Sequence, residues 1–121
     1  MNRNQIRTKV KQLINKANKM YRLEMDMPTI SFFSKGTRAG WSMSDTNSVG
    51  FNEVLAQENS EQFKAIVIHE VAHLVTDTIF PNAKRPHGKE FQVIDMSLGG
   101  EGFSNHDFDT RNVEVKRKHN D

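Results

Sequence analysis

The sequence predicts an α+β fold: an N-terminal amphipathic helix, a small three-stranded antiparallel sheet and two further helices. Three observations lead to this order. An apolar pattern of helical period opens the chain, short runs rich in aromatic and β-branched residues follow it, and two more helical patterns come after them, separated by prolines. With 121 residues and a mass of 13.9 kDa the chain has the size of one compact domain. We therefore expect a single domain over residues 1–121, with a basic tail at residues 111–121.

A first helix is predicted over residues 2–24. Its apolar side chains recur at spacings of three and four residues, which places them on one face of a helix and predicts that this face is buried. They are Ile6, Val10, Leu13, Ile14, Ala17 and Tyr21. Basic residues lie along both margins of that stripe, so we expect the exposed surface of the helix to be cationic. Pro28 prevents the helix from continuing.

Three short antiparallel strands are predicted in the next stretch, because their residues are aromatic or β-branched and turn-forming segments separate them. They cover residues 29–33, 39–44 and 48–52. Gly40 and Gly50 lie inside these runs and mark either bulges or places where another group approaches the backbone closely. We expect residues 53–59 to be a connection. Alternating valines at residues 113–115 allow a late strand.

Two helices are predicted after the strands. The longer one begins at Ser60, which is suited to the N-cap position, and runs to about Phe80, where Pro81 ends it. After a turn-forming loop, a shorter helix begins near His87 or Gly88 and ends at a Gly-Gly pair. We expect the longer helix to be largely buried, since most of its residues are apolar.

Composition excludes several classes of protein and site. The chain has no cysteine, so disulfides, thiolate nucleophiles and cysteine-ligated zinc are impossible, and any metal must be held by histidines and carboxylates. No apolar run approaches the roughly 20 residues needed to cross a bilayer, and the first residues lack the apolar segment of a secretory signal. We therefore expect a cytoplasmic protein that does not bind membranes.

The charges are distributed unevenly along the chain, although the net charge is only +2. Seven basic residues and no acidic residue precede Leu23: Arg3, Arg7, Lys9, Lys11, Lys16, Lys19 and Arg22. A second basic group, at residues 116–118, lies close to the end of the chain. Two cationic ends favour an acidic partner such as nucleic acid, while the alternative is a solvated surface that keeps the protein soluble.

The sequence His69-Glu70-Val71-Ala72-His73 lies inside the longer helix of the second half. Four residues of helix correspond to about 400°, so His69 and His73 project from nearly the same side of the helix and can coordinate one ion. Glu70 projects about 100° away from His69, where a general base must stand to take a proton from a metal-activated water. The pattern predicts a Zn²⁺ site; the alternative is two packed or exposed histidines at helical spacing.

A catalytic zinc ion usually has three protein ligands, so a third ligand is needed. The metzincin pattern is excluded, because it requires glycine and histidine where this chain has Thr76 and Ile79. His87 is the preferred candidate, since it follows a turn after the metal helix and opens the next helix. Glu90 and Glu101 remain alternatives.

The run HEVAH, followed after thirteen intervening residues by HGKEF, resembles the SprT-like metalloprotease domain, whose pattern is HExxH, a short loop and HGxxF. Similar segments are AGW, SVGFNEVL and NHDF, so the resemblance covers roughly residues 30–108. It implies a zincin-like fold, His69, His73 and His87 as zinc ligands, and Glu70 as the catalytic glutamate. It also implies an endopeptidase that hydrolyses proteins, including proteins bound or crosslinked to DNA.

Relatives of this kind commonly add a zinc ribbon with four cysteines, or tails that bind DNA and partners, and this chain contains neither. The resemblance therefore implies a minimal, monomeric form, as in a phage or another compact genome. We expect it to contact DNA through the basic N-terminal helix and the C-terminal tail. We interpret His106 and Asp107 as structural. The rival hypotheses are a non-catalytic nucleic-acid- or protein-binding module with a structural or vestigial zinc site, and an effector that binds one target.

Overall fold

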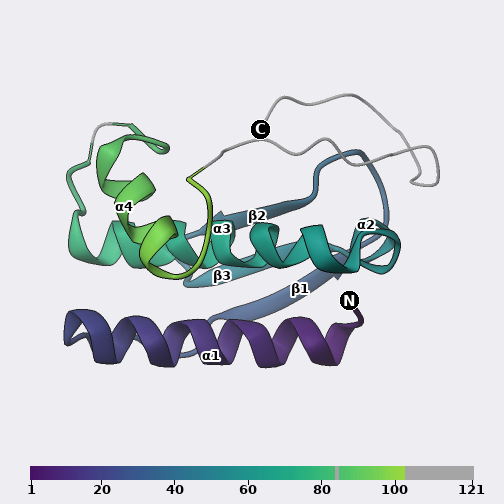
Figure 1. The fold of residues 1–121 in the computed structure, drawn as a ribbon, viewed down its shortest axis with the longest axis horizontal. Helices are drawn as coiled ribbons and strands as arrows, with labels where there is room; N and C mark the ends of the chain where they lie inside the picture. The colour runs from purple at the N-terminus through teal and green to yellow at the C-terminus, as the bar shows by residue number, and fades with distance from the viewer. Residues whose placement is uncertain (84, 103–121) are drawn as a thin grey trace.

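The computed structural model describes residues 1–83 and 85–102 and has the predicted α+β architecture (Figure 1). In chain order its elements are α1 (Arg3–Tyr21), β1 (Thr29–Phe33), β2 (Gly40–Met43), β3 (Ser48–Asn52), α2 (Glu53–Glu58), α3 (Ser60–Ile79) and α4 (Lys89–Ser97). The late strand predicted at residues 113–115 and the basic tail at 111–121 lie outside the described residues. No helix in the described ranges combines the length and the apolar character that a membrane span requires.

The sheet is mixed, so the prediction of a purely antiparallel sheet was wrong for one of its two pairings. Its strand order is β1-β3-β2, with β3 antiparallel to β2 and parallel to β1. β2 and β3 form a hairpin whose turn ends at Asn47, a residue type that tolerates its left-handed φ of 47°. β3 is the most buried strand, and it takes the central place that covers both of its edges.

One row of side chains across the sheet shows which face the helices cover. Phe32, Phe51 and Gly40 are register partners on neighbouring strands, so they point to the same face. Phe51 packs edge-on against Phe63 of α3, with ring centroids 6.1 Å apart, and Gly40 lies against Glu70 of the same helix. Phe32 lies beneath α1, and α1 and α3 run side by side in Figure 1. The two long helices therefore form one layer over one face of the sheet.

The long helices follow their sequence patterns closely. The predicted apolar stripe of α1 is buried at Ile6, Val10, Leu13, Ile14 and Ala17. α3 runs from Ser60 to Ile79, as expected, but Ser60 is its first helical residue and not its N-cap. Asn59 occupies the N-cap position without a capping bond from its side chain. α4 begins directly after Gly88, as predicted.

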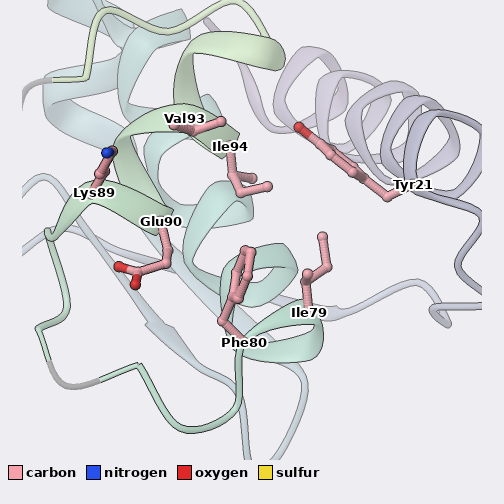
Figure 2. Close-up of a pocket in the computed structure, with 7 residues that line it drawn as sticks. All are labelled: Tyr21, Ile79, Phe80, Lys89, Glu90, Val93 and Ile94. Carbon is pink, nitrogen blue, oxygen red and sulfur yellow. The ribbon is translucent and has the colours of Figure 1, made fainter.

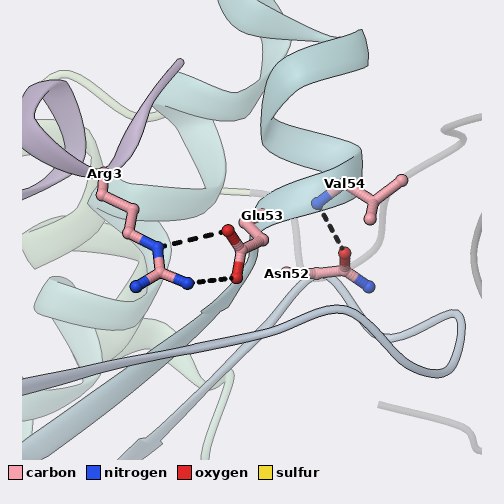
Figure 3. A network of polar contacts seen from close by, with 4 residues as sticks. All are labelled: Arg3, Asn52, Glu53 and Val54. Atoms are coloured by element: carbon pink, nitrogen blue, oxygen red, sulfur yellow. Dashed lines mark hydrogen bonds and ion pairs between the residues drawn. The ribbon is translucent and has the colours of Figure 1, made fainter.

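Residues 53–58 are a short helix, α2, where the sequence predicted only a connection. The reason is Asn52, whose side chain is fully buried at the end of β3. Its Oδ1 accepts hydrogen bonds from the backbone N–H groups of Val54 (3.1 Å) and Leu55 (3.3 Å), which caps the helix (Figure 3). Its Nδ2 donates to the carbonyls of Gly36 and Arg38, both at 3.2 Å. Asn52 thus ties the β1–β2 loop to the β3–α2 junction.

We expect Asn52→Ala to lower the free energy of unfolding by about 2 to 4 kcal/mol, since it removes a cap and leaves buried polar groups without partners. Asn2→Ala is the matched control, because Asn2 also caps a helix but is exposed. It should cost about 1 kcal/mol or less. Chemical denaturation of both variants checks this, and equal losses would contradict the role given to Asn52.

Candidate metal centre

His69 and His73 lie one turn apart on α3, in its most buried part. The helix is almost entirely apolar around them, so it packs against α1, the sheet and α4. His69 is 9% exposed and Glu70 is 7% exposed. One imidazole and a carboxylate are therefore held within the core of the domain, with the half-buried His73 beside them, and polar groups there are costly unless they find partners.

His87 reaches the same place from the loop before α4. A turn in which the Gly88 N–H donates to the Arg85 carbonyl (3.2 Å) precedes the helix. A Cβ atom on Gly88 would lie only 3.2 Å from Arg85 Cβ, so the turn is tight and glycine suits it. The turn presents His87 immediately ahead of α4.

The ring nitrogens of the three histidines converge. The Nε2 atom of His73 lies 3.1 Å from Nε2 of His69 and 3.0 Å from Nε2 of His87. One Nε2 atom has a single in-plane hydrogen-bonding direction, either a proton or a lone pair, so it cannot form two well-aligned hydrogen bonds to these two nitrogens. Tetrahedral zinc with bonds of about 2.0–2.1 Å would separate its ligand nitrogens by roughly 3.3 Å. The three histidines are thus placed to hold a metal ion; three imidazoles also suit other divalent ions.

The protonation state of His73 favours metal binding. Burial, together with the neighbouring His69 and His87, lowers the pKa of His73 to about 3. The ring is therefore neutral at physiological pH and offers a lone pair. Without a cation, its nitrogen would face two other nitrogens in a largely buried place.

Glu70 lies between α3 and the β2 edge of the sheet, in a space that Gly40 leaves open. A Cβ atom on Gly40 would lie 3.1 Å from Glu70 Cγ and 3.3 Å from Glu70 Oε2. The prediction that Gly40 marks either a bulge or a close approach is thereby answered in favour of a close approach. The sequence did not indicate that the approaching group is the glutamate of the metal motif.

Gly50 is also a place of close approach, on the other face of the sheet. A Cβ atom there would lie 2.1 Å from two atoms of the Trp41 indole, so the indole lies directly on the glycine. Because Trp41 follows Gly40 in β2, it points away from the face that α3 covers. The half-buried Trp41 is thus neither in the helix-covered core nor on the face that carries Glu70.

The other sequence candidates for a third ligand lie elsewhere. Glu90 lines a separate, mostly apolar pocket of about 330 Å³. Figure 2 shows Ile79 and Phe80 at the end of α3 pointing toward Val93 and Ile94 of α4, and the three histidines are not part of its lining. Glu101 is exposed and does not join the histidines in the described part of the chain. His106 and Asp107 lie outside the described residues.

Comparison with known proteins gives a consistent family assignment. The model of the SprT-like family matches residues 10–119. Protein SprT of Shewanella oneidensis is 36% identical over 114 residues, which cover 93% of this chain and 72% of the relative. Protein SprT of Actinobacillus succinogenes is 33% identical over 116 residues (93% and 66%), and that of Pseudomonas aeruginosa is 35% identical over 96 residues (78% and 58%).

The chain therefore spans between 58% and 72% of the length of these curated relatives. No solved structure matches it. The family model nevertheless covers most of the chain, and the resemblance read from HEVAH and HGKEF agrees with it. This chain belongs to the SprT-like family.

Proposed function

We propose that the chain is a zinc-dependent endopeptidase that hydrolyses peptide bonds in proteins. In this proposal His69, His73 and His87 hold the zinc ion and Glu70 is the catalytic base. The observation that carries it is the convergence of three ring nitrogens, 3.0 and 3.1 Å apart at His73, on the helix that also carries the buried Glu70. Membership of the SprT-like family supports the same assignment.

The roles of the residues follow from this placement. A bound zinc ion would act as a Lewis acid toward a water molecule and the scissile carbonyl. Glu70 is one residue after a ligand on the same helix, so its carboxylate stands beside the ion and not on it. It accepts the proton of the attacking water and then delivers that proton to the leaving amine nitrogen.

The edge strand of the sheet offers a place for the substrate polypeptide to bind. β2 is an edge strand, and its Gly40 touches Glu70. In the part of the chain that the structure describes, no strand pairs with the outer edge of β2, so an extended polypeptide that pairs there would pass close to the proposed base. Such pairing uses backbone groups, so it discriminates little between side chains and suits a protease that acts on many proteins.

We also propose that DNA brings substrates to the enzyme, so that proteins bound or crosslinked to DNA are cut. Not every cation of α1 is available for this. The guanidinium of Arg3 lies 5.0 Å from the Phe32 ring centroid and pairs with Glu53 (Figure 3), and that of Arg7 lies 5.1 Å from the same ring. Exposed cations farther along the helix remain: Lys11, Lys16 and Lys19. Contacts of this kind weaken steeply with salt.

A cleavage assay on a DNA-bound protein, with DNA or a chelator added or omitted, tests the proposal. We expect cleavage that the chelator abolishes, and a loss of about 100- to 10,000-fold in Glu70→Gln with its zinc retained, because Glu70 is a base and not a ligand. Glu61→Gln is the control, since Glu61 is exposed on the same helix. Loss of zinc from Glu70→Gln would contradict the assignment of Glu70 as a base. If the zinc-loaded parent cuts no substrate, the rival hypothesis of a non-catalytic binding module is favoured.

We expect His87→Ala to weaken zinc binding by at least about 100-fold, because it removes one of only three proposed ligands. Glu90→Gln is the control, since it alters the rival ligand three residues away. Competition with a chelator of known affinity measures both. Unchanged affinity in His87→Ala together with weaker binding in Glu90→Gln would reverse the assignment of the third ligand.

We expect Gly40→Ala to lower kcat by about 10- to 100-fold with zinc affinity unchanged, because the new methyl group would lie 3.0 Å from the Gly50 carbonyl oxygen and 3.1 Å from Glu70 Cγ, and the Glu70 side chain is the more flexible of the two neighbours. Gly36→Ala is the control that distinguishes displacement of the Glu70 carboxyl from a general loss of stability. Gly36 has a φ of +83°, which strains alanine, but a Cβ atom there would meet nothing within 4 Å. Equal loss of activity in the two variants would mean that Gly40 acts only through stability.

A further inference from the structure

Phe91 touches all three histidines of the proposed metal centre. Its side chain is fully buried at the start of α4, on the helical turn that follows His87. The Phe91 ring stacks on His73, with centroids 4.4 Å apart and an angle of 27° between the planes. It meets His69 at 5.0 Å and His87 at 5.2 Å, both at steep angles.

The four rings form one compact cluster, because each ring contacts every other. The His69–His73 and His73–His87 centroids are both 4.7 Å apart, and those of His69 and His87 are 5.1 Å apart. All six centroid distances therefore lie between 4.4 and 5.2 Å. Phe91 is the only member of this cluster without a ring nitrogen, so it fills space that none of the ligands fills.

The direction of each imidazole nitrogen depends on the side-chain torsions of its histidine. A free imidazole samples several orientations, and only a few of them point its lone pair at the shared position. Phe91 limits these orientations, because a rigid, flat ring that is buried behind three others leaves them little room to turn. The effect is largest at His73, whose Nε2 atom makes both short contacts and whose ring lies almost parallel to that of Phe91.

We propose that Phe91 is a positioning residue for the metal centre: its ring holds the three imidazoles in ligand geometry before the metal binds. This inference rests on the proposed zinc site, and it adds a residue that offers no ligand atom. The proposed role distinguishes Phe91 from an ordinary core residue, because the replacement of an ordinary core residue would lower stability without changing metal affinity. Because a ligand set that is already ordered loses less freedom on binding, Phe91 contributes directly to metal affinity.

The test compares Phe91→Leu with Phe63→Leu. Phe63 is equally buried, lies on α3 and packs against Phe51, away from the four-ring cluster. Three quantities are measured for the full chain: the zinc dissociation constant by chelator competition, the visible spectrum of the cobalt-loaded chain, and the Tm of the metal-free chain. We expect both variants to lose Tm, whereas only Phe91→Leu raises the zinc dissociation constant, by about 10- to 100-fold, and changes the cobalt spectrum.

A zinc dissociation constant and a cobalt spectrum that are the same in Phe91→Leu, Phe63→Leu and the parent would overturn the positioning role while leaving the zinc site intact. If the parent itself binds no zinc, the proposed metalloprotease fails, and this inference fails with it. Should Phe91→Leu not fold, Phe91→Met serves in its place, because methionine fills irregular space without a flat ring. It should weaken zinc binding in the same way.

Discussion

The convergence of three imidazoles beside a buried carboxylate constrains the surrounding structure: His69 and Glu70 are buried, and His73 and His87 are half-buried. Polar groups in such a place are costly unless they are paired, and the Nε2 atom of His73 faces only other nitrogens among its short ring contacts. A divalent cation would relieve this cost by accepting the lone pairs of the rings. Helical spacing brings two of the histidines together, and the tight turn before α4 supplies the third.

The strand order links the sheet to the same site. In a simple meander the strands would lie in chain order, β2 would be central, and its edges would both be paired. In the observed order β3 is central and β2 is an edge strand, with Gly40 against Glu70. Among residues 1–83 and 85–102, the mixed sheet thus leaves the outer edge of β2 unpaired beside the proposed base. The central position of β3, the most buried of the three strands, therefore determines where β2 lies relative to the site.

Much of this arrangement could be predicted from the sequence, because it depends on local patterns. The apolar periods indicated α1, α3 and α4, and helical geometry alone places His69 and His73 on one side. The parallel pairing of β1 with β3 was missed, since it joins strands that are not neighbours in the chain. The short helix α2 was also missed, although Asn52, which caps it, is a residue type that favours the N-cap position. The contacts of Phe91 depend on packing between two helices and a loop, which no local pattern reveals.

X-ray absorption at the zinc edge, on the full chain loaded with one equivalent of zinc, would report the ligands of the proposed site. We expect three imidazole nitrogens at about 2.0–2.1 Å and one further light donor from solvent. A spectrum that fits fewer than three imidazoles, or a fourth ligand supplied by the protein, would contradict this expectation. Fewer than three imidazoles would rule out the proposed set of three histidine ligands, and a fourth protein ligand would make the zinc site structural.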